Sequence, residues 1–121
     1  MHSVRPMTEI IYKICPRQDW QVAKDAGVYT GAPVDLADGF IHFSSATQVA
    51  GTAAKHFAGQ EDLVLLEIDV SRLDGDLRWE VSRGDALFPH LYDTMPVSAV
   101  VGVHNLAWDG EKHIFPEGIS G

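Results

Sequence analysis

The sequence predicts an α+β fold built as a single domain. Short segments with alternating apolar residues recur along the chain, two amphipathic helical patterns interrupt them, and turn residues separate neighbouring strands. A length of 121 residues, 45% of them apolar, suits one hydrophobic core. We therefore expect residues 1–7 to be a loose leader and residues 8–121 to form one domain.

The first elements are a strand and a helix. Residues 9–14 alternate as a strand, with Ile10, Tyr12 and Ile14 on one face. Pro16 suits the first position of a helix, which Gly27 would end. A loop is expected over residues 31–39, because it carries two glycines and a proline.

A second strand and helix follow. Residues 40–44 read as a short strand whose polar side chains share one face. Ser45 and Gln48 fit a capping box, so a helix is expected from Ser45 to a stop at Gly59.

The C-terminal half reads as strands and turns. Residues 63–70 form the most apolar segment and predict a central strand buried on both faces. Strands are also expected over residues 77–81 and 97–103, with an irregular loop over 82–96 between them. Asp109 and Gly110 predict a terminal hairpin.

Composition narrows the classes of partner. Nine basic and seventeen acidic residues give a net charge of −8, which opposes bulk binding to nucleic acid or to an anionic membrane. A single cysteine, Cys15, and the lack of a long apolar run favour a cytoplasmic protein. The histidines lack the spacing of zinc ligands, so no metal is expected. Neither GxGxxG nor GxxxxGK occurs, so the sequence does not support a Rossmann or P-loop nucleotide site. Oligomeric state is left open.

His42 and Ser44 are the first candidate site residues. They share a strand face that leads into a helix N-terminus, where unpaired amides favour an anion such as a phosphate. The alternative is that His42 is a core histidine and that the serines only cap the helix.

Two further groups of candidates lie in the second half of the chain. Arg78 and Glu80 share a strand face, where Arg78 could hold a phosphate and Glu80 could bind hydroxyls or act as a base. Arg83, His90 and Tyr92 belong to the expected 82–96 loop, and such loops often bind ligands. The alternatives are a solvated Glu80, a Tyr92 that anchors the loop, and an exposed His90.

Four motifs, IYKI (11–14), GFIHFS (39–44), LRWE (77–80) and FPHLY (88–92), resemble domain-of-unknown-function family 952 over roughly residues 8–116. That family resembles a small branch of the ADP-ribosyltransferase fold. The resemblance implies two small, mostly antiparallel sheets that form a split cleft for NAD, with two or three short helices. His42-Phe43-Ser44 is similar to a His-apolar-Ser motif of RNA 2′-phosphotransferases. Lys13, however, stands beside Tyr12 where those enzymes have a histidine.

The resemblance implies an enzyme that transfers a group from NAD, ADP-ribose or a phosphorylated ribose compound. In that hypothesis His42 orients a ribose hydroxyl or phosphate, Lys13 contacts a phosphate, and Glu80 or His90 polarises the attacking group. NAD would be a substrate, and no cofactor would be bound permanently. The second hypothesis is a module that binds a nucleotide or ADP-ribose without turnover, and the third is a structural domain.

Overall fold

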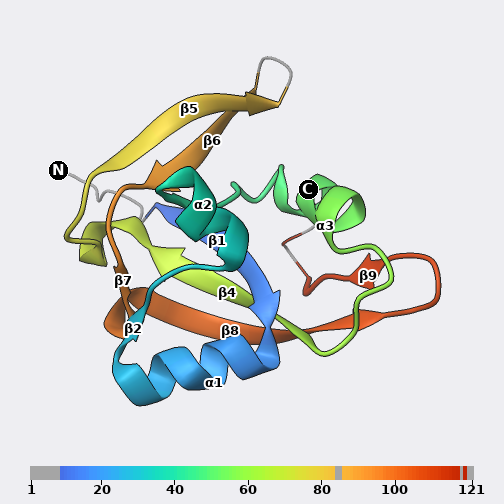
Figure 1. The fold of residues 1–121 in the computed structure, drawn as a ribbon. Helices are drawn as coiled ribbons and strands as arrows, with labels where there is room; N and C mark the ends of the chain where they lie inside the picture. The colour runs from blue at the N-terminus through green and yellow to red at the C-terminus, as the bar shows by residue number, and fades with distance from the viewer. Residues whose placement is uncertain (1–8, 84–85, 118, 120–121) are drawn as a thin grey trace, which may run out of the picture.

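The computed structural model describes residues 9–83, 86–117 and 119, with backbone alone at Arg83, and the predicted leader lies outside this range. The fold is α+β, as predicted, and Figure 1 shows its arrangement. The helices are α1 (Arg17–Ala26), α2 (Pro33–Asp38) and α3 (Val49–His56). The strands are β1 (Ile10–Pro16), β2 (Val28–Tyr29), β3 (Ile41–His42), β4 (Leu63–Asp69), β5 (Leu77–Arg83), β6 (Ala86–Leu91), β7 (Met95–Pro96), β8 (Val100–Trp108) and β9 (His113–Ile114).

The main sheet has the strand order β1-β4-β8-β9, and all its pairs are antiparallel. Strand β4 lies inside this sheet, and four of its residues, Leu63 to Leu66, are almost fully buried. A strand that is covered on both faces needs apolar residues at successive positions, which explains the continuous apolar run. The prediction of a central strand is confirmed.

Two smaller sheets complete the fold. Strands β3, β6 and β5 form a three-stranded antiparallel sheet, and β2 pairs with β7. The three-stranded sheet meets the main sheet where Tyr12 and Ser44 exchange backbone hydrogen bonds of 2.7 and 2.9 Å. This junction places β3 beside β1, although residues 17–40 separate the two strands in the sequence.

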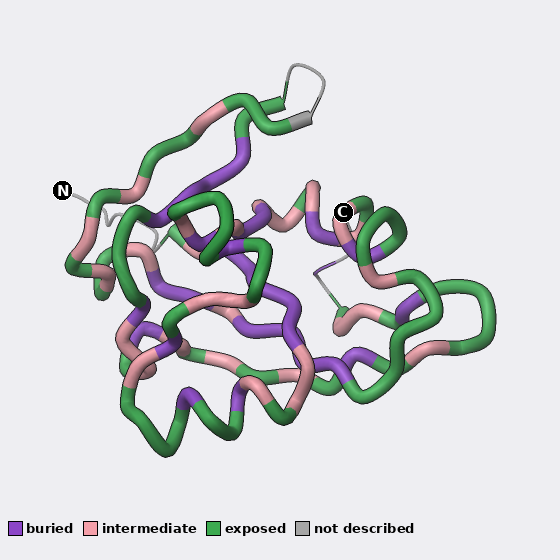
Figure 2. The backbone as a smooth tube through the Cα atoms, viewed as in Figure 1, coloured by how far each residue is buried: buried purple, intermediate pink, exposed green. Residues whose placement is uncertain are grey.

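Helices cover both faces of the main sheet. On one face, Trp20 and Ala23 of α1 pack with apolar residues of β1 and β4, and on the other face Val49 and Ala53 of α3 do so. Figure 2 shows the buried backbone running through the centre of the molecule. Within the described residues, no helix is long and apolar enough to cross a membrane.

The first two predicted helices are present with changed bounds. Helix α1 ends where Gly27 adopts a left-handed φ of 81°, as predicted. Pro16 closes β1 instead of opening the helix, since it continues the pairing with Leu63. Helix α3 begins at Val49 and not at Ser45. Gln48 still reaches back to the Ser45 amide at 3.0 Å, as a capping box requires.

Three predictions for the connecting segments are wrong. The expected loop over residues 31–39 contains α2, which Pro33 opens and Gly39 ends with a φ of 88°. The expected loop over 82–96 contains β6 and β7, so the candidates there lie in sheets or beside them. A short 3₁₀ turn over Val97–Ala99 delays the last long strand to Val100. The terminal hairpin is confirmed by β8 and β9.

Candidate functional site

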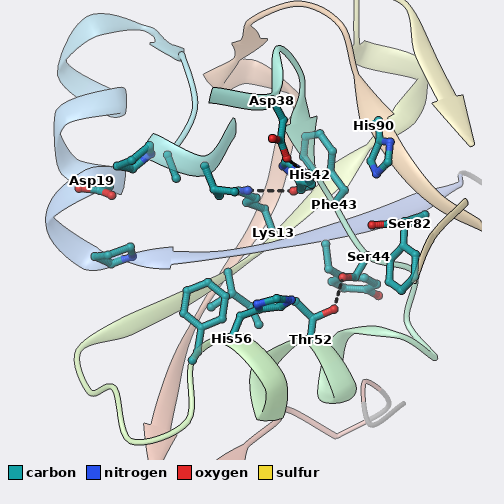
Figure 3. A pocket seen from close by; sticks show the side chains of 18 residues that line it. Lys13, Asp19, Asp38, His42, Phe43, Ser44, Thr52, His56, Ser82 and His90 are labelled. Atoms are coloured by element: carbon teal, nitrogen blue, oxygen red, sulfur yellow. Dashed lines mark hydrogen bonds and ion pairs between the residues drawn. The ribbon is translucent and has the colours of Figure 1, made fainter. Parts of the chain in front are cut away.

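A cavity of about 570 Å³ opens where the two larger sheets meet. Strands β1, β3 and β6 and helices α2 and α3 contribute to its walls. The polar residues around it are Lys13, Asp19, Asp38, His42, Ser44, Thr52, His56, Ser82 and His90 (Figure 3). Apolar side chains, among them Phe43, Phe57 and Phe88, form much of the remainder. A cavity of this size and character suits a small organic ligand.

A buried ion pair joins Lys13, which lines the cavity, to Asp35 of α2. The Lys13 ammonium lies 3.2 and 3.0 Å from the two carboxylate oxygens of Asp35, and it donates to the His42 carbonyl at 2.9 Å. Both side chains are less than a tenth exposed. Asp35 also accepts hydrogen bonds from the amides of Ala32 and His42. Asp35 thereby joins β1, α2 and β3 at one point.

The pKa values of this pair reflect burial and mutual charge. Burial raises the pKa of Asp35, but the His42 hydrogen bond and the Lys13 charge outweigh it and lower the pKa to about 2. Burial lowers the pKa of Lys13, whereas the Asp35 charge opposes that shift. Asp35 is therefore ionised at neutral pH and supplies the counter-charge that Lys13 needs in a buried position.

His42 is held between two carboxylates. Its Nδ1 atom lies 2.7 Å from Asp35, and its Nε2 atom lies 2.9 Å from Asp38. Carboxylates only accept hydrogen bonds, so both contacts form together when both ring nitrogens carry a proton. The structure thus favours a cationic His42, whose side chain is 28% exposed at the cavity. It does not show the fully buried core histidine of the alternative interpretation.

His90 has a different arrangement. Its Nδ1 atom lies 2.9 Å from Glu80, which also accepts a 2.7 Å hydrogen bond from the Tyr92 hydroxyl. The ring stacks on Phe40 with centroids 4.2 Å apart. Its Nε2 atom is buried and has no hydrogen-bond partner among the described residues. The hydrogen bonds of Glu80, first to Tyr92 and then to His90, lower the pKa of this carboxyl. It is therefore an ionised acceptor for the His90 ring.

The structure places four predicted site residues around the cavity: Lys13, His42, Ser44 and His90. The Ser44 hydroxyl is hydrogen-bonded to Thr52 at 2.8 Å. The enzyme hypothesis gave His42, Glu80 and His90 roles at one substrate. Glu80, however, does not belong to the cavity wall and contacts the ring of His90 from β5.

The other predicted residues lie apart from the cavity wall. Arg78 is 2.7 Å from Asp76 and stacks over the Tyr92 ring, with its guanidinium carbon 4.7 Å from the ring centroid. Tyr92 borders a second cavity of about 290 Å³, which Phe40 also lines. The side chain of Arg83 lies outside the described part of the chain. Among the described residues, Lys13 lines the cavity and Arg78 does not, and each is paired with its own aspartate.

Sequence reasoning missed Asp35, Asp38, Thr52 and His56. The first two were assigned to a loop, although Pro33 and Gly39 bracket them as helix signals. A lysine on an otherwise apolar strand was also a signal, since it needs a buried acid nearby. Thr52 and His56 lie four residues apart, so they share the face of α3 that reaches the cavity.

These features define a small α+β protein with two sheets joined edge to edge and a histidine-lined, ligand-sized cavity at their junction. The chain belongs to the family described as "Protein of unknown function (DUF952)", whose model matches residues 14–103. The likeness to ADP-ribosyltransferases stays a prediction.

Solved structures of one relative resemble the whole fold. The crystal structure of protein CC0527 from Caulobacter crescentus is 49% identical, covers 86% of this chain and 91% of its own, and has a TM-score of 0.81. A solution NMR structure of CC0527 has the same identity, covers 86% of this chain and 90% of its own, and has a TM-score of 0.76. No curated protein matches the chain.

Proposed function

We propose that the protein is an enzyme that acts on the glycosidic bond of a ribosyl compound, with the cavity of about 570 Å³ as its active site. The substrate class comes from the resemblance to ADP-ribosyltransferases, whose substrate NAD carries such a bond. The observation that carries the proposal is the unpartnered Nε2 atom of His90. A buried ring nitrogen without a partner is unfavourable, and a bound ligand, water or ion can satisfy it.

Glu80 prepares His90 to act as a general base. Because a carboxylate accepts the Nδ1 proton, the neutral ring carries its proton on Nδ1 and leaves Nε2 as a proton acceptor. In the proposed step Nε2 removes the proton of a water or alcohol hydroxyl. That oxygen then bonds to the anomeric carbon of the ribosyl group, and the base leaves with the electrons of the broken C–N bond.

His42 and the aromatic walls would position the substrate. The Asp38 side chain that binds His42 Nε2 is 48% exposed, so a ribose hydroxyl can replace it as the partner of this nitrogen. Phe43 and Phe88 offer flat apolar surfaces to a base ring. Ser44 and Thr52, already hydrogen-bonded to each other, can extend this hydrogen bonding to the ligand.

A binding module without turnover is the second candidate, and the position of Glu80 favours it. In the transferase hypothesis this carboxylate could polarise the attacking group directly. Here it contacts His90 and Tyr92 and does not belong to the cavity wall. If the relay through His90 does not operate, the same cavity would only hold its ligand.

Turnover of nicotinamide riboside, NAD and ADP-ribose should be followed by chromatography of the released base or ribose product. We expect activity on at least one of them. His90→Gln should lower kcat by roughly 10²- to 10⁴-fold while the melting temperature changes by only a few degrees.

His104→Gln is the matched control. His104 also contacts a glutamate, with its Nε2 atom 2.6 Å from Glu67, but it does not belong to the cavity wall, so this variant should keep full activity. Equal losses in the two variants would contradict the role of His90. Binding of these compounds without any turnover would favour the binding module.

A further inference from the structure

We infer that the compound bound in this cavity is a nucleoside without phosphate groups. The inference rests on the proposed function and specifies its substrate class. It departs from the expectation that Lys13 and Arg78 contact a phosphate. Three observations carry it: the saturation of Lys13, the acids around the cavity, and the acceptor character of His90.

Lys13 has no hydrogen left for a ligand. An ammonium group has three N–H donors, and the two Asp35 oxygens and the His42 carbonyl lie within 3.2 Å of it. A phosphate would have to displace Asp35, which is itself held by the amides of Ala32 and His42. Lys13 is the only lysine or arginine among the described residues that line the cavity. A bound phosphate would therefore find no available donor of the kind that usually recognises it.

The carboxylates around the cavity oppose an anion. Asp35 pairs with Lys13, and Asp38 contacts His42. Asp19, in the first turn of α1, also lines the cavity and forms no ion pair with another described residue. These aspartates outnumber the one lysine at the cavity, so they disfavour a phosphate dianion in a partly closed space.

His90 selects a donor on the ligand. Its Nε2 atom is an acceptor because Glu80 takes the proton of Nδ1. A ribose hydroxyl can donate to such an atom, whereas an ionised phosphate oxygen only accepts, so His90 cannot serve as a partner for a phosphate dianion. The aromatic walls beside it suit an uncharged ring. A sugar with free hydroxyls and a flat base satisfies both requirements.

Binding of matched pairs tests the inference. Calorimetry on the wild-type protein should compare adenosine with adenosine 5′-monophosphate, and nicotinamide riboside with its 5′-monophosphate. We expect at least one nucleoside to bind about tenfold or more tightly than its own monophosphate. A monophosphate that binds as tightly as its nucleoside, or more tightly, in both pairs would overturn the inference. Failure of all four compounds to bind would overturn it as well.

Two variants of α1 distinguish the effect of a charge at the cavity from the effect of the protein's net charge. Asp19→Asn removes the carboxylate at the cavity, and Asp25→Asn makes the same change at an exposed position of the same helix outside the cavity wall. Asp19→Asn should reduce the preference for the nucleoside by about threefold, and Asp25→Asn should leave it unchanged. Equal effects would overturn the electrostatic basis.

Different results would refute the proposed function and this inference. A clear nucleoside preference with no turnover refutes the enzyme and leaves this inference intact. Turnover that depends on His90 and prefers the monophosphates refutes this inference and leaves the enzyme intact.

Discussion

Asp35→Asn, which removes the buried partner of Lys13, should be strongly destabilising. The variant keeps the side-chain shape but removes the counter-charge of a lysine that is 7% exposed. Lys13 can escape the penalty by losing its proton, and at pH 7 this costs about 5 kcal/mol from its ordinary pKa of roughly 10.4. We therefore expect a loss of about 3–5 kcal/mol in the free energy of unfolding.

Urea denaturation followed by circular dichroism measures this loss. For a domain of this size it corresponds to a fall in Tm of roughly 10–25 °C. Asp76→Ala is the control, because its ion pair with Arg78 is more than half exposed and should contribute less than about 1 kcal/mol. The double variant Lys13→Met/Asp35→Asn removes both charges and should recover about 2 kcal/mol relative to Asp35→Asn.

The reasoning would be refuted by either of two results. One is a loss for Asp35→Asn no larger than that for Asp76→Ala. The other is a double variant that is less stable than Asp35→Asn, which would mean that the unpaired ammonium is not the source of the penalty.

Three further predictions concern stability and reactivity. The pKa of Asp35 is about 2 in the folded protein and 3.8 in its reference state. Its ionisation therefore contributes about 2 kcal/mol to the free energy of unfolding above pH 4, and this contribution is lost as the pH falls toward 2. The Asp35→Asn variant should lack this part of the pH dependence in acid denaturation. Gly75→Ala should destabilise by about 1–3 kcal/mol in urea melts, because its Cβ would lie 2.2 Å from that of Asp93. Gly51→Ala, in an open position of α3, should stabilise by up to about 1 kcal/mol. Burial raises the pKa of the Cys15 thiol to about 12, so a thiol reagent should modify it only after unfolding, and rapid modification of the native protein would contradict its buried position.

The sequence predicted the strands of the main sheet well, because their signals are local. Residues 63–70 read as a buried strand, and Asp109-Gly110 as a hairpin. Strand β6 was missed because Pro89 interrupts its pattern, and proline lacks the amide proton that a strand usually donates. Its carbonyl nevertheless accepts from the Phe43 amide at 3.0 Å. Along this segment Phe88 and His90 alternate with Pro89 and Leu91. This period of two was the signal that could have identified the strand.

Only part of the candidate site could be predicted from the sequence. His42 and His90 stand out as polar residues within apolar segments, and they do line the cavity. Asp35 was not predicted, because the sequence of a six-residue helix has too little periodicity to be distinguished from a turn. Its partnership with Lys13 spans 22 residues, and only the tertiary fold brings them together. The contact between Glu80 and the His90 ring depends on the pairing of β5 with β6, and that strand was not predicted.

The backbone exchange between Tyr12 and Ser44 makes the junction of the two sheets observable. Their amides donate only to each other's carbonyls in the described structure, so separation of the sheets exposes both protons to solvent without unfolding either sheet. Amide hydrogen exchange at these two positions therefore reports how often the cavity floor opens. A ligand that spans the junction will slow both rates together, and the protection factors will give its effect on the opening equilibrium directly.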